Sequence, residues 1–148
     1  MTRAVVTRAV DWTDTDAAGH HHHSAIIRWV EAAENALHED LGLLDLFGSA
    51  PRVRYEVDYL DRLWFREQVV TTLQIEKVGT SSLTYAFEVE GPRGLAARGR
   101  MICVNISGPG GAEGSGGSSV PWPDEIRARL SADLPPSPLH VRRRSTPQ

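Results

Sequence analysis

The chain has 148 residues, 41% of them hydrophobic and 24% charged, which is ordinary for one globular domain with a real core. The formal net charge of -3 gives no basis for a nucleic-acid or acidic-membrane partner. Single Cys103 cannot form an internal disulfide and no signal peptide or membrane span is visible, so we expect a cytoplasmic protein with no membrane partner.

Residues 3–12 predict a first strand, and an acidic turn and four consecutive histidines follow it. From Ser24 onward the sequence predicts an amphipathic helix that ends at Gly42. Its apolar stripe, which we expect to be buried, consists of Ile26, Val30, Ala33, Leu37 and Leu41. Its polar stripe, which we expect to face solvent, consists of Arg28, Glu31, Asn35 and His38.

After the helix the hydrophobic period changes to two. Residues 52–59 alternate apolar and charged side chains and predict a half-buried strand. Further strands are expected over residues 67–78, 83–90 and 95–106, separated by short Gly-containing turns. One strand, one long helix and four more strands indicate an α+β domain with the helix against one face of an antiparallel sheet.

The composition changes after Ile106. We expect a domain over residues 1–107, a Gly/Ser-rich connector over 108–120, a short helical segment over 121–131 and a disordered tail over 132–148. Pro123 near the first turn is typical of a helix start.

The strand-to-helix junction carries the main functional signal. It contains the turn Asp14-Thr15-Asp16-Ala17-Ala18-Gly19, then His23 seven residues after Asp16, the helical run Arg28-Trp29-Val30-Glu31-Ala32-Ala33 and the closing Leu41-Gly42. This ungapped pattern resembles the 4-hydroxybenzoyl-CoA thioesterase family of hotdog-fold proteins. Weaker similarity continues through the strands and to the segment Pro121-Trp122-Pro123-Asp124-Glu125-Ile126.

The resemblance implies a hotdog fold, in which a curved antiparallel sheet wraps one long helix. It also implies hydrolysis of an acyl-CoA or acyl carrier protein thioester to the free acid and thiol. No cofactor is implied, because coenzyme A is part of the substrate. The resemblance further implies a homodimer or homotetramer with active sites at the subunit interface.

Asp16 is the candidate catalytic carboxylate, acting as nucleophile or as the base that activates water. The alternative is an ordinary helix N-cap, a role for which Asp14 is the better candidate. The backbone amides of Gly19 and His23 are expected to polarise the thioester carbonyl, and the His23 ring to assist. His23 could equally be a plain loop residue, since it is one of four adjacent histidines.

Three further features of the sequence give weaker functional signals. Four consecutive histidines do not converge on one ion as an i, i+4 pair does, so we expect no metal site in His20–His23. Trp12 stands where some relatives have a catalytic tyrosine; it is expected in the pocket wall or the core. Thr80, Ser81 and Ser82 are candidate substrate contacts near a neighbouring subunit's site, although turn chemistry explains them equally well.

Two rival functions remain at this point. A hotdog dehydratase or hydratase would carry an Asn-Pro after the aspartate and a His-x-Asp, which the sequence lacks. A non-catalytic hotdog domain that only binds acyl thioesters is compatible with the histidine run and the missing tyrosine. The chain has no G-x-S-x-G elbow of a serine hydrolase.

Overall fold

The computed structural model describes residues 1–106 and 118–137. The first half of the fold contains β1 (Arg3–Ala9), the short 3-10 helix η1 (Trp12–Asp14), the long helix α1 (His23–Leu41) and the 3-10 helix η2 (Leu44–Gly48). The second half contains β2 (Arg52–Tyr59), β3 (Gln68–Val78), β4 (Ser82–Gly91), β5 (Gly94–Val104) and α2 (Asp124–Leu130).

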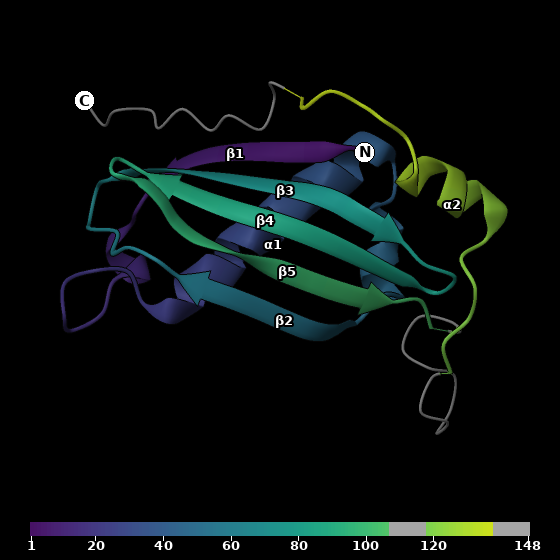
Figure 1. Cartoon of the computed structure of the whole chain (residues 1–148), viewed down its shortest axis with the longest axis horizontal. Coiled ribbons are helices and arrows are strands. Elements are labelled where there is room, and N and C mark those ends of the chain that lie inside the picture. The colour runs from purple at the N-terminus through teal and green to yellow at the C-terminus, as the bar shows by residue number, and fades with distance from the viewer. Residues whose placement is uncertain (107–117, 138–148) are drawn as a thin grey trace.

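The five strands form one sheet in the order β1-β3-β4-β5-β2, and every neighbouring pair is antiparallel. Helix α1 crosses behind this sheet (Figure 1). The predicted α+β class and hotdog arrangement are therefore confirmed. The first strand is shorter than predicted, because the chain leaves β1 at Ala9 and turns into η1.

The core lies between α1 and the inner face of the sheet. Helix α1 contributes large buried side chains such as Ile26, Trp29 and Leu37, which belong to one core cluster with Leu73 and Phe87 from the central strands. Removing one such side chain from water stabilises the fold by about 1.5–3 kcal/mol. The alternation predicted for the strands arises because every second side chain enters this layer.

Two features set the length of α1. His22 is the N-cap, and its Nδ1 accepts a hydrogen bond of 3.2 Å from Ser24 N–H. At the other end Gly42 has φ of 69°, a left-handed conformation in which glycine avoids the strain of a side chain. The predicted helix thus holds, with its start at His23 rather than Ser24.

The predicted polar stripe of α1 is wrong at His38. His38 is only 3% exposed and Glu34 only 2%, and both lie between the apolar positions of the helix face that packs on the sheet. His38 donates from Nδ1 to Leu43 O at 3.2 Å and accepts at Nε2 from Tyr85 OH at 2.5 Å. Glu34 pairs with Arg52. Burial of these polar groups is possible because each has a hydrogen-bonding partner.

Strand β2 is more exposed than its alternation predicted. It pairs with β5 and forms an edge of the sheet, and Val53 is 62% exposed. Its outer edge therefore presents unpaired backbone groups that another chain can bind.

The C-terminal segment packs on the domain. Trp122 and Leu130 are buried, and Thr2 N–H donates to Ala132 O at 3.1 Å. Residues 107–117 of the predicted connector and 138–148 of the predicted tail lie outside the described residues. No helix in the described part of the chain is long and apolar enough to cross a membrane.

Candidate active site

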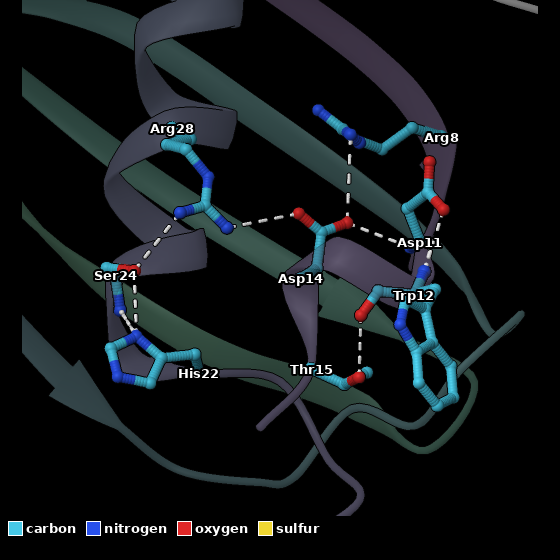
Figure 2. A network of polar contacts seen from close by, with 8 residues as sticks. All are labelled: Arg8, Asp11, Trp12, Asp14, Thr15, His22, Ser24 and Arg28. Atoms are coloured by element: carbon cyan, nitrogen blue, oxygen red, sulfur yellow. Dashed lines mark hydrogen bonds and ion pairs between the residues drawn. The ribbon is translucent and has the colours of Figure 1, made fainter. Parts of the chain in front are cut away.

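The loop between β1 and α1 is organised around Asp14, as Figure 2 shows. Its side chain is buried and accepts a hydrogen bond from Asp11 N–H at 2.8 Å. Arg28 of α1 contacts the same carboxylate at 3.2 Å and Arg8 of β1 at 3.7 Å. Asp14 therefore ties the loop to a strand and to the helix, and all its carboxylate contacts are with protein groups.

Asp16, two residues later, is in a different situation. Gly19 N–H donates to Asp16 O at 3.0 Å and closes a tight turn in which Gly19 has φ of 86°. Ala18 N–H donates to Asp16 Oδ1 at 2.8 Å. No ion pair joins Asp16 to any residue within 1–106 or 118–137. One carboxylate oxygen of this half-buried side chain is thus fixed, and within residues 1–106 and 118–137 no hydrogen bond holds the other.

A cavity of about 590 Å³ opens beside this turn. Its volume is typical of a small-molecule site. The wall is mostly polar and consists of Asp16, His20, His21, His23, Tyr59, Leu60, Asp61 and Arg62. Arg93 contacts Asp61 at 2.9 Å, and this hydrogen bond holds the pKa of Asp61 below its usual value. Asp61 is already paired, which leaves Asp16 as the carboxylate without a cation.

The amino end of α1 also faces the cavity, through His23. The first N–H groups of a helix have no acceptor inside the helix and carry its partial positive charge. Tyr59 OH donates to His23 O at 3.0 Å and so holds the first helical turn against the end of β2. Asp16 and His23, the two predicted catalytic residues, therefore lie on one cavity wall.

The four histidines differ in burial and in their contacts, although the His22 and His23 rings pack against each other with centroids 4.0 Å apart. The His20 ring packs edge-on against Trp64, with the ring centroids 5.6 Å apart. The His21 ring is buried, while His22 caps the helix and the His23 side chain is exposed. Among residues 1–106 and 118–137, no three His, Cys, Asp or Glu side chains are arranged to hold a metal ion.

Burial lowers the pKa of His21, and the neighbouring His20 ring lowers it further. Sequence reasoning did not single out His21, because four adjacent histidines give no sign of which ring turns inward. The bridge between Thr15 and His21 places the backbone, and Leu63 N–H, which donates to His21 Nδ1 at 3.1 Å, holds the ring.

The predicted substrate contacts do not join Asp16 within one subunit. Trp12 is 73% exposed, which excludes a place in the core, and it packs edge-on against Phe65. Thr80, Ser81 and Ser82 lie at the end of the sheet that carries α2, and their carbonyl oxygens accept hydrogen bonds from Trp122 and Asn105. Their predicted role toward a neighbouring subunit stays a prediction.

A larger hollow of about 840 Å³ lies elsewhere on the sheet and is lined by Arg3, Glu56, Asp58, Glu88, Arg98 and Arg100 among others. Its charges are largely paired: Arg100 contacts Glu76 at 2.8 Å and Arg98 contacts Asp58 at 3.9 Å. It lacks the helix amino end that lies beside Asp16 in the smaller cavity.

Residues 10–130 match the family described as the thioesterase-like superfamily. The chain belongs to this superfamily. The matched segment includes the Asp16 turn, α1 and the whole cavity wall, and it confirms the predicted class of enzyme, a thioester hydrolase. A comparison with curated protein sequences gives no match.

Solved structures of thioesterases share the fold. A protein from Bacillus stearothermophilus described as a predicted thioesterase is 26% identical, with a TM-score of 0.74, over 97% of this chain and 100% of that one. A thioesterase from Thermus thermophilus, complexed with coenzyme A and Zn, is also 26% identical, with a TM-score of 0.74, over 86% and 97%. A 1,4-dihydroxy-2-naphthoyl-CoA thioesterase from Synechocystis is 18% identical over 90% and 100%, with a TM-score of 0.76.

Proposed function

We propose that this thioesterase-like protein hydrolyses acyl thioesters of coenzyme A or of an acyl carrier protein in the cavity beside Asp16. Water adds its oxygen to the acyl carbon, the carbon–sulfur bond breaks, and the thiol leaves with a proton. The observation that carries the proposal is that a carboxylate without a cation and the amino end of α1 line one cavity. The reaction needs no metal ion or organic cofactor.

Asp16 supplies the negative oxygen that starts the reaction. Because Ala18 N–H holds Oδ1, the other oxygen has a fixed direction from which to attack the acyl carbon or take a proton from water. Both routes place negative charge on the thioester oxygen.

The His23 amide is the donor we assign to that oxygen. A positioned backbone N–H at a developing oxyanion is typically worth about 10² to 10³ in rate. Gly19 N–H, the second donor predicted from the sequence, already binds Asp16 O and instead shapes the turn. We assign to the exposed His23 ring the protonation of the departing thiolate.

We further propose that two copies pair through their β2 edges. An exposed strand edge with the apolar Val53 favours pairing with an identical edge about a twofold axis. In an antiparallel pair the Asp16 end of one subunit lies beside the α2 end of the other. Thr80, Ser81 and Ser82 of the partner subunit then approach the cavity, which is how they can contact substrate.

Thiol release from a panel of acyl-CoAs tests the catalytic assignment. Asp16→Asn keeps the size of the side chain and removes the base, so kcat falls by about 100-fold or more. Asp45→Asn is the matched control, because Asp45 is exposed beyond the far end of α1. Unchanged kcat in Asp16→Asn would exclude Asp16 from the mechanism, and binding of acyl-CoA without turnover by the wild type would indicate a non-catalytic domain.

Sedimentation analysis tests the subunit contact. Val53→Lys places a charge on the β2 edge and shifts the protein toward monomer, because edge lysines oppose strand pairing. Arg98→Gln on β5, the strand that pairs with β2, is the control, and we expect it to sediment with the same oligomeric mass as the wild type. A dimer that persists unchanged in Val53→Lys at low protein concentration would place the contact elsewhere.

A further inference from the structure

Two rings in the cavity wall have no part in the mechanism above. His20 and His21 both line the cavity, and the His21 side chain belongs to a residue only 6% exposed. Their ring centroids lie 6.0 Å apart. A buried polar ring that reaches a cavity without a protein partner on one side is suited to bind a polar atom of a ligand.

The hydrogen bonds of His21 fix where its proton lies. Leu63 N–H donates to His21 Nδ1 at 3.1 Å, so Nδ1 carries no hydrogen. Burial keeps the ring neutral by lowering its pKa, and a neutral ring then carries its hydrogen on Nε2. Within the described residues no acceptor binds that hydrogen. His21, which lines the cavity, therefore has one hydrogen-bond donor that the described residues do not use.

His20 has the opposite arrangement. Its Nδ1 lies 3.1 Å from His21 O, and because a carbonyl oxygen can only accept, Nδ1 carries the hydrogen. In the neutral ring Nε2 is then an acceptor, and no donor from residues 1–106 or 118–137 binds it. The two neighbouring rings thus leave one donor and one acceptor unused by the described residues, and both residues line the same cavity.

We propose that His20 and His21 together bind a hydroxyl group on the acyl part of the substrate. A hydroxyl has one hydrogen to donate and lone pairs to accept, so it satisfies both rings at once. Two hydrogen bonds of about 2.8 Å to one oxygen can join rings at the observed separation. The inference rests on the proposed function and names its substrate class as hydroxyacyl thioesters.

The position of the pair relative to Asp16 limits where the hydroxyl stands. Asp16 N–H donates to His20 O at 3.1 Å, and Thr15 and His21 face each other in a β-bridge. The two rings therefore start from backbone directly beside the carboxylate that acts on the acyl carbon. A hydroxyl on the second or third carbon of the acyl chain is within this reach.

The same groups discriminate against plain alkyl chains. An alkyl group would displace water from both rings and leave a donor and an acceptor unpaired, which a site built for a hydroxyl disfavours. A keto group at the same carbon satisfies His21 and leaves His20 unpaired. The expected order of kcat/KM is therefore hydroxyl, then keto, then alkyl.

The test compares three thioesters of one chain length: 3-hydroxybutyryl-CoA, acetoacetyl-CoA and butyryl-CoA. With the wild-type protein we expect kcat/KM for the hydroxy compound to exceed that for the alkyl compound by about tenfold or more. The matched aromatic pair, 4-hydroxybenzoyl-CoA and benzoyl-CoA, places the hydroxyl farther from the thioester. Discrimination confined to the aromatic pair overturns the assignment to the second or third carbon.

Asparagine substitutions distinguish the proposed binding of the hydroxyl by Nε2 from the contacts of Nδ1 that hold the loop. The amide of Asn stands near the position of Nδ1 of His but does not reach Nε2. His21→Asn can still accept from Leu63 N–H, and His20→Asn can still donate to His21 O, while each loses its group in the cavity. We expect either variant to lower the hydroxy-to-alkyl ratio of kcat/KM about tenfold. Asp45→Asn keeps the wild-type ratio.

Each outcome decides between the two proposals. Hydrolysis of all three thioesters with ratios near one, or ratios unchanged in both Asn variants, overturns the hydroxyl site and leaves the hydrolase intact. Loss of hydrolysis with every thioester would contradict the proposed function instead. In that case the dissociation constants of the same thioesters are measured by calorimetry in place of kcat/KM. Equal affinities for the hydroxy and alkyl compounds overturn the hydroxyl site.

Discussion

Polar groups lie in two regions, the loop that precedes α1 and the buried face of α1 itself, and their surroundings differ. In the loop before the amino end of α1, Asp16, His20 and His21 line a cavity and keep hydrogen-bonding capacity that no described protein group uses. Along the middle and carboxyl end of α1, Glu34 and His38 are buried and bound to Arg52 and Tyr85. Both regions are polar, yet of these two sets of described residues it is the first that lines a cavity and has hydrogen-bonding atoms without a protein partner.

The two regions therefore differ not in polarity but in whether their polar groups already have hydrogen-bonding partners in the protein. Glu34, His38, Arg52 and Tyr85 have such partners and form a structural cluster. Cys103 contributes to the structural cluster: its thiol lies 3.9 Å from Glu34, and burial raises the pKa of the thiol to about 12, so it is no nucleophile. Substitutions in the buried cluster should then change stability with little effect on chemistry, and substitutions at the amino end should do the reverse.

The largest effect on stability is expected from Glu34→Ala. This change leaves the Arg52 guanidinium without its buried partner and opens a cavity, which together lower the free energy of unfolding by about 4 kcal/mol. Urea unfolding measures the loss, with Glu34→Gln as the control that keeps the side-chain volume. If Glu34→Ala kept the wild-type free energy of unfolding but lost thioester hydrolysis, the proposed difference between the two regions would be wrong.

The second effect is a pH dependence from His38. Burial lowers its pKa from 6.5 to about 4 in the folded protein. As the pH falls, His38 of the unfolded chain therefore binds a proton before His38 of the folded protein does. The contribution of the neutral ring to stability is complete above pH 6.5 and is lost as the pH falls toward 4. At about 1.4 kcal/mol per pKa unit, the loss is about 3 kcal/mol.

His38→Gln cannot titrate and should not show this loss, which urea unfolding at several pH values would detect. Glu34 acts in the opposite direction, because burial raises its pKa and its contribution to stability falls as the pH rises. Glu34 is present in both proteins, so the comparison cancels it. Identical pH profiles for the two proteins would show that the His38 ring is not held neutral.

The smallest effect on stability is expected from Asp14→Asn. The variant loses the charge that Arg8 and Arg28 contact but can still accept from Asp11 N–H, so it is destabilised by about 2 kcal/mol. Its kcat falls less than that of Asp16→Asn, because Asp14 acts only through the loop. Asp11→Asn is the control, because Asp11 is the N-cap of η1 and accepts from Trp12 N–H at 2.7 Å, a bond that asparagine can keep. Equal losses of kcat at both positions would place Asp14 in the chemistry.

The sequence predicted the helix, the strand order along the chain and the placement of Asp16 beside a helix start. These follow from local patterns: apolar spacing on α1, alternation on the strands, and glycine at Gly42. The resemblance then linked Asp16 and His23, which the structure places on one cavity wall.

The features that the sequence did not predict depend on contacts distant along the chain. His38 was assigned to solvent because of its polarity, and Glu34, four residues earlier on the same helix face, was not singled out. Their burial depends on Arg52 and Tyr85, which come from later strands. The inward turn of His21 likewise depends on Leu63, forty-two residues further along the chain.

The hydrogen bond from Tyr59 OH to His23 O joins the end of β2 to the first residue of α1, so it would connect the proposed subunit contact to the proposed site. Tyr59 ends the strand that we propose as the subunit contact, and His23 supplies the proposed oxyanion donor. Self-association would therefore stiffen the catalytic amide, and specific activity would rise with enzyme concentration until assembly is complete. A cell could then set the output of this protein through its abundance, steeply at low expression and linearly at high expression.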